Sequence, residues 1–294
     1  MGAFLNVAII FIFNKIITMS KLIATDLDGT LFYPKHRIRM ISKKSLRFIR
    51  KFIDEGNQFA IVSGRNASFG FKVAKKINRE ISIVGCNGAF VYHKDKKIFS
   101  KTIDPESAKK VIEYIEETYK PKAYFIMSNE NDFVLRNRFK TLFYKFGYFM
   151  WYWTQGVYRE SYFVSKEKFD QIIEENKAYK FMTMFGIFKK DQIRASLANK
   201  EIFKKFGNII EPSWSNEFIE YSPVGTSKSI GLKFLADYLN IDHSDIYVVG
   251  DSGNDISMFK DFSENSFSME HAPLSVSKYA SHVIKRFEDI EKYI

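Results

Sequence analysis

Residues 22–31 read Leu-Ile-Ala-Thr-Asp-Leu-Asp-Gly-Thr-Leu, and this stretch decides the fold class of the chain. An apolar run ends abruptly at two carboxylates, Asp26 and Asp28, which are followed by Gly29 and Thr30. Residues i and i+2 of a β-strand point to the same side, so a strand ending here predicts both acids at one spot. Ligands of open α/β sheets bind at the carboxyl ends of the strands. Two adjacent acids suit metal-assisted phosphoryl transfer, with one as nucleophile and the other as proton donor.

The segments that follow this stretch predict further parallel strands. Apolar residues at helical spacing cover residues 42–55, and a short apolar run of strand character covers 58–62. A second helix is expected at 67–78 and a third strand at 81–85. This β-α-β-α-β alternation predicts a parallel sheet with right-handed crossovers.

The pattern changes after residue 88 and returns near residue 227. A hairpin at 89–102 and a helix at 104–119 are followed by mixed elements, which predicts an inserted α+β unit. Within the insertion we expect strands near 124–127, 158–164 and 181–188, and helices near 166–177 and 191–206. The alternation then resumes with a helix at 227–239, a strand at 246–249, a helix ending near 262, and edge strands at 266–269 and 282–284.

The expected organisation is therefore a split α/β core with an insertion. We expect residues 19–88 and 215–294 to form the core and residues 89–214 to form the inserted domain, which is large enough to fold as a unit. Residues 1–18 form an apolar extension that is too short and too interrupted for a confident spanning helix. They also lack the basic start and small-residue cleavage site of a secretory signal. We expect no stable membrane insertion, with a membrane-associating segment as the alternative.

The composition excludes several classes of protein. Hydrophobic residues make up 46% and charged residues 27% of the 294 residues, as in globular proteins. The net charge of +11 comes from basic residues spread along the chain. There is no Arg-rich block or zinc-finger spacing, so no nucleic-acid partner is expected. The single cysteine, Cys86, excludes an internal disulfide and indicates a cytoplasmic protein.

Polar side chains follow the expected core strands or begin the helices that face them. Each cluster alone is a common turn or a solvated helix residue. Their order along the chain and their shared edge favour catalysis, with donors for a phosphate and carboxylates for Mg²⁺. The clusters are Asp26, Asp28 and Thr30, then Ser63, Gly64 and Arg65, then Lys228, and finally Asp251, Asn254 and Asp255.

These motifs resemble those of the haloacid dehalogenase (HAD) superfamily, in its Cof-type branch, over residues 20–285. The motifs are Asp-Leu-Asp-Gly-Thr at 26–30, Ser63, Lys228 and Gly-Asp-Ser-Gly-Asn-Asp at 250–255. The resemblance implies a Rossmann-like parallel-sheet core with an inserted α+β cap domain. It also implies a magnesium-dependent phosphatase that hydrolyses small phosphorylated metabolites, such as sugar phosphates or phosphorylated cofactors.

The resemblance further implies a role for each acid. Asp26 attacks phosphorus and forms an aspartyl-phosphate, whereas Asp28 protonates the leaving group and then activates water. Magnesium is held by Asp26, the backbone carbonyl of Asp28, and Asp251. Thr30 and Asp255 are expected to contact these metal ligands and hold them in place, without binding the metal themselves.

The resemblance assigns the phosphoryl group to Ser63, Lys228 and the amide of Gly64, and Lys228 also offsets charge at the nucleophile. Asn254 matches a position that contacts phosphate or orders the metal shell. Arg65 and Asn87 lie near the expected cap hinge and are candidates to contact substrate. The chain departs from the branch at Ser229, at His271-Ala272 and at Glu288-Asp289-Ile290, and these departures leave the expected chemistry intact.

The oddest part of the insertion is residues 139–159, which hold ten aromatic residues. This stretch is interpreted as cap core plus a dimer or cap–core contact surface. The alternatives are an aromatic wall for a flat substrate and a platform for single-stranded nucleic acid. A phosphomutase and a non-catalytic phospholigand-binding protein remain alternative functions. The expected assembly is a monomer or a homodimer.

Overall fold

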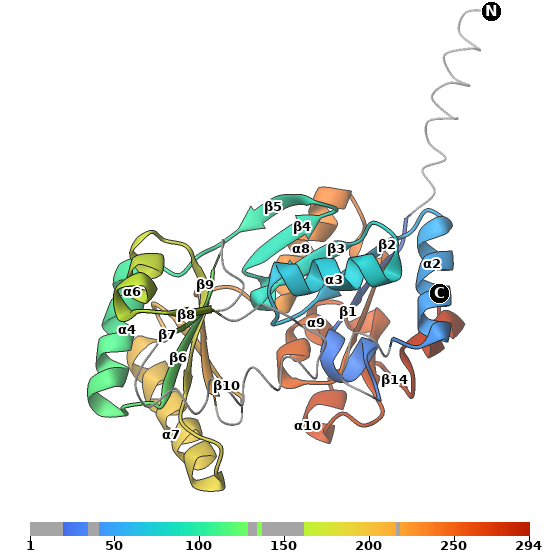
Figure 1. The fold of residues 1–294 in the computed structure, drawn as a ribbon. Helices are drawn as coiled ribbons and strands as arrows, with labels where there is room; N and C mark the ends of the chain where they lie inside the picture. Colours follow the sequence, from blue (N-terminus) through green and yellow to red (C-terminus); the bar gives the residue numbers. More distant parts are fainter. Residues whose placement is uncertain (1–19, 35–40, 129–133, 137–161, 216–217) are drawn as a thin grey trace, which may run out of the picture.

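Two β-sheets, each with its own helices, make up the computed structural model of the chain (Figure 1). The structure describes residues 20–34, 41–128, 134–136, 162–215 and 218–294. The eight-stranded sheet has the order β14-β13-β12-β1-β2-β3-β4-β5, and the six-stranded sheet has the order β10-β11-β9-β6-β7-β8. The expected α/β class with a mostly parallel sheet is confirmed.

The eight-stranded sheet is parallel from β14 to β3 and continues into an antiparallel hairpin. From β1 the chain moves outward through β2 and β3 on one side, whereas β12, β13 and β14 lie on the other. The order of strands thus reverses between β1 and β12, which is where open α/β sheets bind ligands. Its strands are β1 (Leu22–Thr25), β2 (Gln58–Val62), β3 (Ser82–Gly85), β4 (Phe90–His93), β5 (Lys96–Ser100), β12 (Ile246–Gly250), β13 (Ser266–Met269) and β14 (His282–Ile284).

Helices cover both faces of this sheet because its central strands are apolar on both sides. Ile23 belongs to the buried cluster shared with α2 (Lys43–Asp54) and α3 (Ala67–Ile77). Its neighbours Leu22 and Ala24 belong to the cluster shared with α8 (Lys228–Leu239) and α9 (Ile256–Asp261). Strands buried on both faces are typical of parallel sheets. A short helix, α10 (Leu274–Ser277), also belongs to this unit.

Among the described residues, the six-stranded sheet buries one face under helices and turns the other toward the eight-stranded sheet. The helices α4 (Pro105–Thr118), α6 (Lys166–Glu174) and α7 (Lys189–Phe206) share a buried cluster with Tyr124 and Phe181. Side chains of the opposite face join the core cluster instead. The strands are β6 (Ala123–Ser128), β7 (Val134–Arg136), β8 (Tyr162–Val164), β9 (Ala178–Met184), β10 (Glu211–Ser215) and β11 (Phe218–Ser222).

The sheet pairing differs from the expected boundaries at residues 89 and 215. The hairpin β4–β5 pairs with β3 and so belongs to the eight-stranded sheet, while β10 and β11 belong to the six-stranded one. The chain passes between the sheets after Ser100 and returns after Ser222. These two passages lie side by side, since the Lys101 ammonium donates to the carbonyl of Val224 at 2.8 Å. The division into two domains stays a prediction.

Most expected elements form within a few residues of their predicted limits. The strand expected at 181–188 instead runs over Ala178–Met184, because Gly186 has a φ of +143° and ends the extended run. Strands β7, β10 and β11 were not predicted. Residues 1–18 and 139–159 lie outside the described residues. In the part of the chain that is described, no helix is long and apolar enough to cross a membrane.

The close packing of α8 on β3 requires glycine at position 231. An ideal Cβ on Gly231 would lie 2.6 Å from Cγ1 of Val84 and 2.9 Å from Cα of Gly88. We expect Gly231→Ala to lower the free energy of unfolding by about 1–3 kcal/mol, because helix and strand must separate. Gly253→Ala is the matched control, since nothing lies within 4 Å of its ideal Cβ. Equal denaturant stability of both variants would contradict this account.

Candidate active site

The first acid of the site is positioned by the end of β1. The strand stops at Thr25, and the backbone N–H of Asp26 donates to the carbonyl of Val249 on β12 at 2.9 Å. Asp26 is 5% exposed, so its carboxylate is buried at the point where the strand order reverses. The location predicted from the sequence for this acid is correct.

The second acid reaches the site by a different route from the one expected. Residues Leu27–Leu31 form a tight turn, so Asp26 and Asp28 do not lie on one face of a strand. Gly29 allows this turn because its φ is +85°, and an ideal Cβ there would lie 2.3 Å from Oδ2 of Asp251. The absence of a side chain therefore lets the loops after β1 and β12 meet.

Lys228 joins the two loops electrostatically. Its ammonium nitrogen lies 2.6 Å from Oδ1 of Asp26 and 2.7 Å from Oδ1 of Asp255, and its side chain is fully buried. Lys228 is the first residue of α8, and Ser227 caps that helix by accepting from the N–H of Ile230. Lys228 thus contacts an aspartate of the first motif and an aspartate of the last.

Burial and charge shift the pKa values of these groups in definite directions. Burial raises the pKa of Asp26 to about 8, although the charge of Lys228 opposes the rise and that of Asp255 adds to it. Burial lowers the pKa of Lys228, but the charges of Asp255 and Asp26 outweigh this and leave it above its ordinary value. Lys228 therefore carries its charge at neutral pH. The pKa of Asp251 is raised, mainly by burial.

Three carboxylates are close enough to surround a cation. Asp26, Asp251 and Asp255 each bring an oxygen within 4.8 Å of the others, and oxygen donors of this kind fit Mg²⁺. Oδ1 of Asp255 accepts from Lys228, and its Oδ2 accepts from the backbone N–H groups of Asp251 and Ser252 at 2.9 Å. Asp255 thus has both oxygens occupied, which leaves Asp26 and Asp251 as the carboxylates suited to a metal.

Asp251 is oriented by a residue of the first motif. The hydroxyl of Thr30 donates to its Oδ1 at 2.8 Å. This bond joins the loop after β1 to the loop after β12. Thr30 and Asp255 are therefore brought to the site, where both contact its acids.

The loop after β2 presents backbone and hydroxyl groups at the same edge. Ser63 is buried, its N–H donates to the carbonyl of Val84, and its hydroxyl accepts from the N–H of Arg65 at 3.2 Å. Asn254 donates to Oδ1 of Asn87 at 3.2 Å. An ideal Cβ on Gly64 would lie 3.1 Å from the same Oδ1. The loops after β2, β3 and β12 thus converge here.

Arg65 contacts the second acid rather than open solvent. Its Nε and Nη2 donate to Oδ2 and Oδ1 of Asp28 at 2.6 and 2.8 Å, which makes a bidentate pair. The guanidinium also lies 4.0 Å from the ring centroid of Phe69. The Asp28 side chain is 40% exposed, so this pair faces the mouth of the site.

Two neighbours of the site were not found by sequence reasoning. The ring of His271 stacks on Tyr33 at 4.1 Å between centroids, and its Nε2 lies 3.6 Å from Oδ2 of Asp251. The sequence signal that could have pointed to His271 was its departure from the family pattern. Lys180 donates to the carbonyl of Gly64 at 3.0 Å, and a lysine within a strand carries no motif that predicts this.

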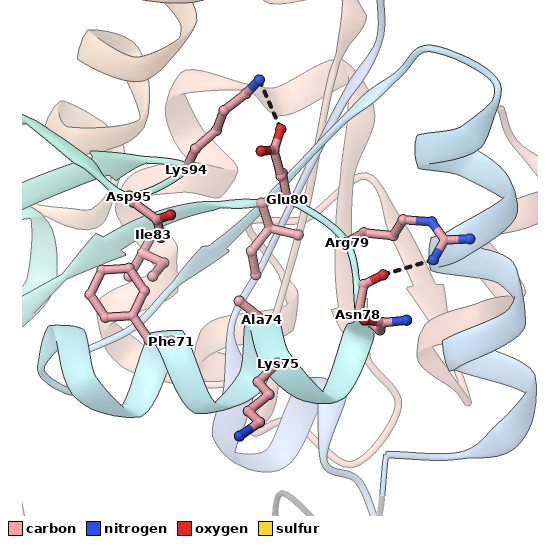
Figure 2. A pocket seen from close by; sticks show the side chains of 10 residues that line it. Phe71, Ala74, Lys75, Asn78, Arg79, Glu80, Ile83, Lys94 and Asp95 are labelled. Carbon is pink, nitrogen blue, oxygen red and sulfur yellow. Dashed lines mark hydrogen bonds and ion pairs between the residues drawn. The ribbon is translucent and has the colours of Figure 1, made fainter.

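A separate cleft of about 550 Å³ lies at the opposite edge of the sheet. Figure 2 shows it between α3 and the turn from β4 to β5, with the Lys94–Glu80 ion pair at its rim. Arg79 and Ile81 lie before the start of β3, so this cleft is at the amino end of that strand. It holds none of the predicted site residues.

The raised pKa of Asp26 generates a prediction about stability. The folded protein keeps the Asp26 proton up to about pH 8, whereas the unfolded chain releases it near about pH 4. Stability of the metal-free wild type therefore falls as the pH rises through this window. We expect Asp26→Asn to raise the melting temperature of chelator-treated protein at about pH 8, by roughly 3 °C or more. The gain should shrink toward about pH 4.

Asp54→Asn is the control for this measurement. Asp54 is a surface acid whose pKa is lowered, mainly by the hydrogen bond from Arg79, so its loss should not stabilise the protein. A pH-independent difference between Asp26→Asn and wild type would contradict the assignment of a buried, proton-holding Asp26.

The comparisons with known proteins agree with this geometry. The sequence pattern of the haloacid dehalogenase-like hydrolases matches residues 23–291. The Bacillus subtilis phosphatase YwtE, named for 5-amino-6-(5-phospho-D-ribitylamino)uracil, is 27% identical over 90% of this chain and 93% of its own. The Escherichia coli phosphatase YbjI, named for the same substrate, is 25% identical over 89% of each.

The fold is shared with solved structures. That of a haloacid dehalogenase-like hydrolase from Bacteroides thetaiotaomicron has a TM-score of 0.74 at 19% identity, covering 94% of this chain and 100% of the other. The chain therefore belongs to the haloacid dehalogenase-like hydrolases, which confirms the predicted family, fold and enzyme class, that of a phosphatase.

Proposed function

We propose that the protein is a magnesium-dependent phosphatase of small phosphorylated metabolites that acts through an aspartyl-phosphate on Asp26. The observation that supports this most directly is the buried contact of 2.6 Å between Asp26 and Lys228, with Asp251 beside them. A binding protein would gain nothing from a buried carboxylate facing an anionic phosphate. A nucleophile needs that position, because its oxygen must reach phosphorus.

In the first half-reaction Asp26, which would have lost its proton once a cation is bound beside it, attacks phosphorus through the oxygen that Lys228 does not hold. The new bond joins that oxygen to phosphorus, and the bond from phosphorus to the ester oxygen breaks. Asp28 gives its proton to the departing alkoxide, which leaves as the alcohol. Ser63, the Gly64 amide and Asn254 hold the phosphoryl oxygens while Lys228 balances their charge.

In the second half-reaction Asp28 removes a proton from water, and the hydroxide attacks phosphorus. The bond to Asp26 breaks, inorganic phosphate leaves, and both acids return to their starting states. Asp28 accepts two hydrogen bonds from Arg65 in this structure, so one oxygen must be released before it carries a proton. We infer that Arg65 turns toward the substrate at that step, and that Asn87 contacts the substrate beside it.

The proposed metal site uses Asp26, Asp251 and the backbone carbonyl of Asp28. Magnesium supplies positive charge that screens the acids from the incoming phosphate. Thr30 and Asp255 keep Asp251 and its loop in place for this purpose. We expect the enzyme to work in the cytoplasm as a monomer or homodimer, without a nucleic-acid partner.

The names of the two relatives suggest where to begin the search for a substrate. Both act on a phosphorylated ribityl chain attached to a pyrimidine. We therefore infer that phosphorylated polyols carrying a flat ring, flavin mononucleotide included, are the first compounds to test. Sugar phosphates and pyridoxal phosphate follow.

The test is phosphate release from this panel with magnesium or with chelator. We expect release that needs magnesium and falls by about 10³-fold or more in Asp26→Asn, because the nucleophile is lost. Release by Asp26→Asn equal to that of wild type would rule out Asp26 as nucleophile. Well-folded wild type that releases no phosphate but interconverts phosphorylated isomers would favour the phosphomutase, and binding without turnover would favour a phospholigand sensor.

Asp28→Asn separates the two half-reactions. We expect turnover of alkyl phosphates to fall by about 10²–10⁴-fold, since both the acid and the base are lost. An aryl phosphate with a good leaving group does not need the proton in the first step. With it the variant should release one burst of phenol per active site, measured by stopped flow, and then stall as phosphoenzyme. A steady rate without a burst would contradict the assigned role.

A further inference from the structure

A buried lysine of the six-stranded sheet contacts the loop after β2 of the other sheet. This loop, residues 63–65, is proposed to bind phosphate and is called the phosphate loop. Lys180 lies on β9, its side chain is 2% exposed, and its ammonium nitrogen is 3.0 Å from the carbonyl oxygen of Gly64. The same nitrogen lies 2.9 Å from Oε2 of Glu220 on β11. One ammonium group thus connects two strands of the six-stranded sheet to the phosphate loop.

The surroundings of Lys180 make this placement costly. Met127 is its cross-strand neighbour on β6, and Met182 is the neighbour of Glu220. Met127 and Met182 are both buried in the cluster that continues into the catalytic core. A buried ammonium group among apolar side chains is unfavourable unless its hydrogen bonds are made, and the side chain of its partner Glu220 is 23% exposed. The bond to the Gly64 carbonyl is therefore part of what stabilises the ammonium group there.

The contact fixes a peptide group that the phosphate site uses. The carbonyl of Gly64 and the N–H of Arg65 belong to one planar unit. Lys180 holds the oxygen end, and the hydroxyl of Ser63 accepts from the N–H end at 3.2 Å. Turning this peptide would move both the Ser63 hydroxyl and the start of the Arg65 side chain.

We propose that Lys180 is a positioning residue, which orients the Gly64–Arg65 peptide and so makes the phosphate loop depend on the six-stranded unit being seated on the core. The inference rests on the proposed function for its catalytic meaning. Its structural part, the ordering of residues 63–65 by Lys180, is independent of that function. Lys180 acts through Gly64 and has no place among the reacting atoms.

The test compares Lys180→Met/Glu220→Gln with Glu220→Gln alone. Methionine has a similar length and matches its neighbours, and the glutamine removes the carboxylate that would be left without its partner. Lys109→Met is the matched control, because that lysine pairs with Glu174 at 2.8 Å on the surface of the same unit. Lys180→Gln, which retains a neutral donor, provides a second variant if the double variant does not fold.

The primary measurement is hydrogen exchange, followed by mass spectrometry, of peptides that cover residues 63–66. We expect exchange there to rise about tenfold in Lys180→Met/Glu220→Gln, the effect of losing one bond to a charged donor. Affinity for inorganic phosphate, titrated calorimetrically with magnesium present, should fall by a similar factor. Lys180→Gln should give a smaller change in the same direction, and Lys109→Met should match wild type. Glu220→Gln, which keeps an oxygen acceptor for the ammonium group, should leave exchange at residues 63–66 unchanged.

Unchanged exchange at residues 63–66 in folded Lys180 variants would overturn the proposal. So would faster exchange spread over the whole chain with a lowered melting temperature, which indicates a merely structural lysine. If wild type released no phosphate from any substrate, the proposed function would fail. The exchange measurement would still decide the role of Lys180 in that case.

Discussion

The buried ammonium group of Lys228 is the interaction on which the rest of the site depends. It is the cation between Asp26 and Asp255, both of which are buried. Carboxylates in such a place repel one another and lose hydration, so they remain together only if a positive charge and hydrogen bonds compensate them. Lys228 supplies that charge from the first turn of α8, so the packing of one helix on the sheet sets the electrostatics of the site.

The parallel sheet explains why residues so far apart in sequence meet there. Asp26 follows β1, Ser63 follows β2, Asn87 follows β3 and Asp251 follows β12. Parallel strands end at a common edge, and the order reverses between β1 and β12, so the two acidic loops diverge from one crevice. The bond from Thr30 to Asp251 and the missing side chain at Gly29 bring these loops into contact. The order of these four strands in the sheet therefore determines which site residues lie next to one another.

Much of this arrangement was predictable from local sequence. Apolar runs that end in Asp, Ser or Gly mark the carboxyl ends of buried strands, and the motif order identified the acids and Lys228. The route of Asp28 was not predictable, because β1 ends at Thr25, whereas the alternation requires the strand to continue to Asp28. The sheet that the β4–β5 hairpin joins was not predictable either. The sequence of a hairpin defines the pairing of its own two strands, but not the strand beside which they lie. Lys180 has no sequence signal, because its partner is a backbone carbonyl 116 residues away.

The two passages of the chain between the sheets lie next to each other, joined by the bond from Lys101 to the carbonyl of Val224. Hinge motions of domains are absorbed by a few residues of the segments that connect them. Such a motion of the six-stranded unit would be absorbed in the two passages, beside Lys101 and Val224. A swing about these passages would return the same face of the six-stranded unit, with Lys180, to the same loop of the core.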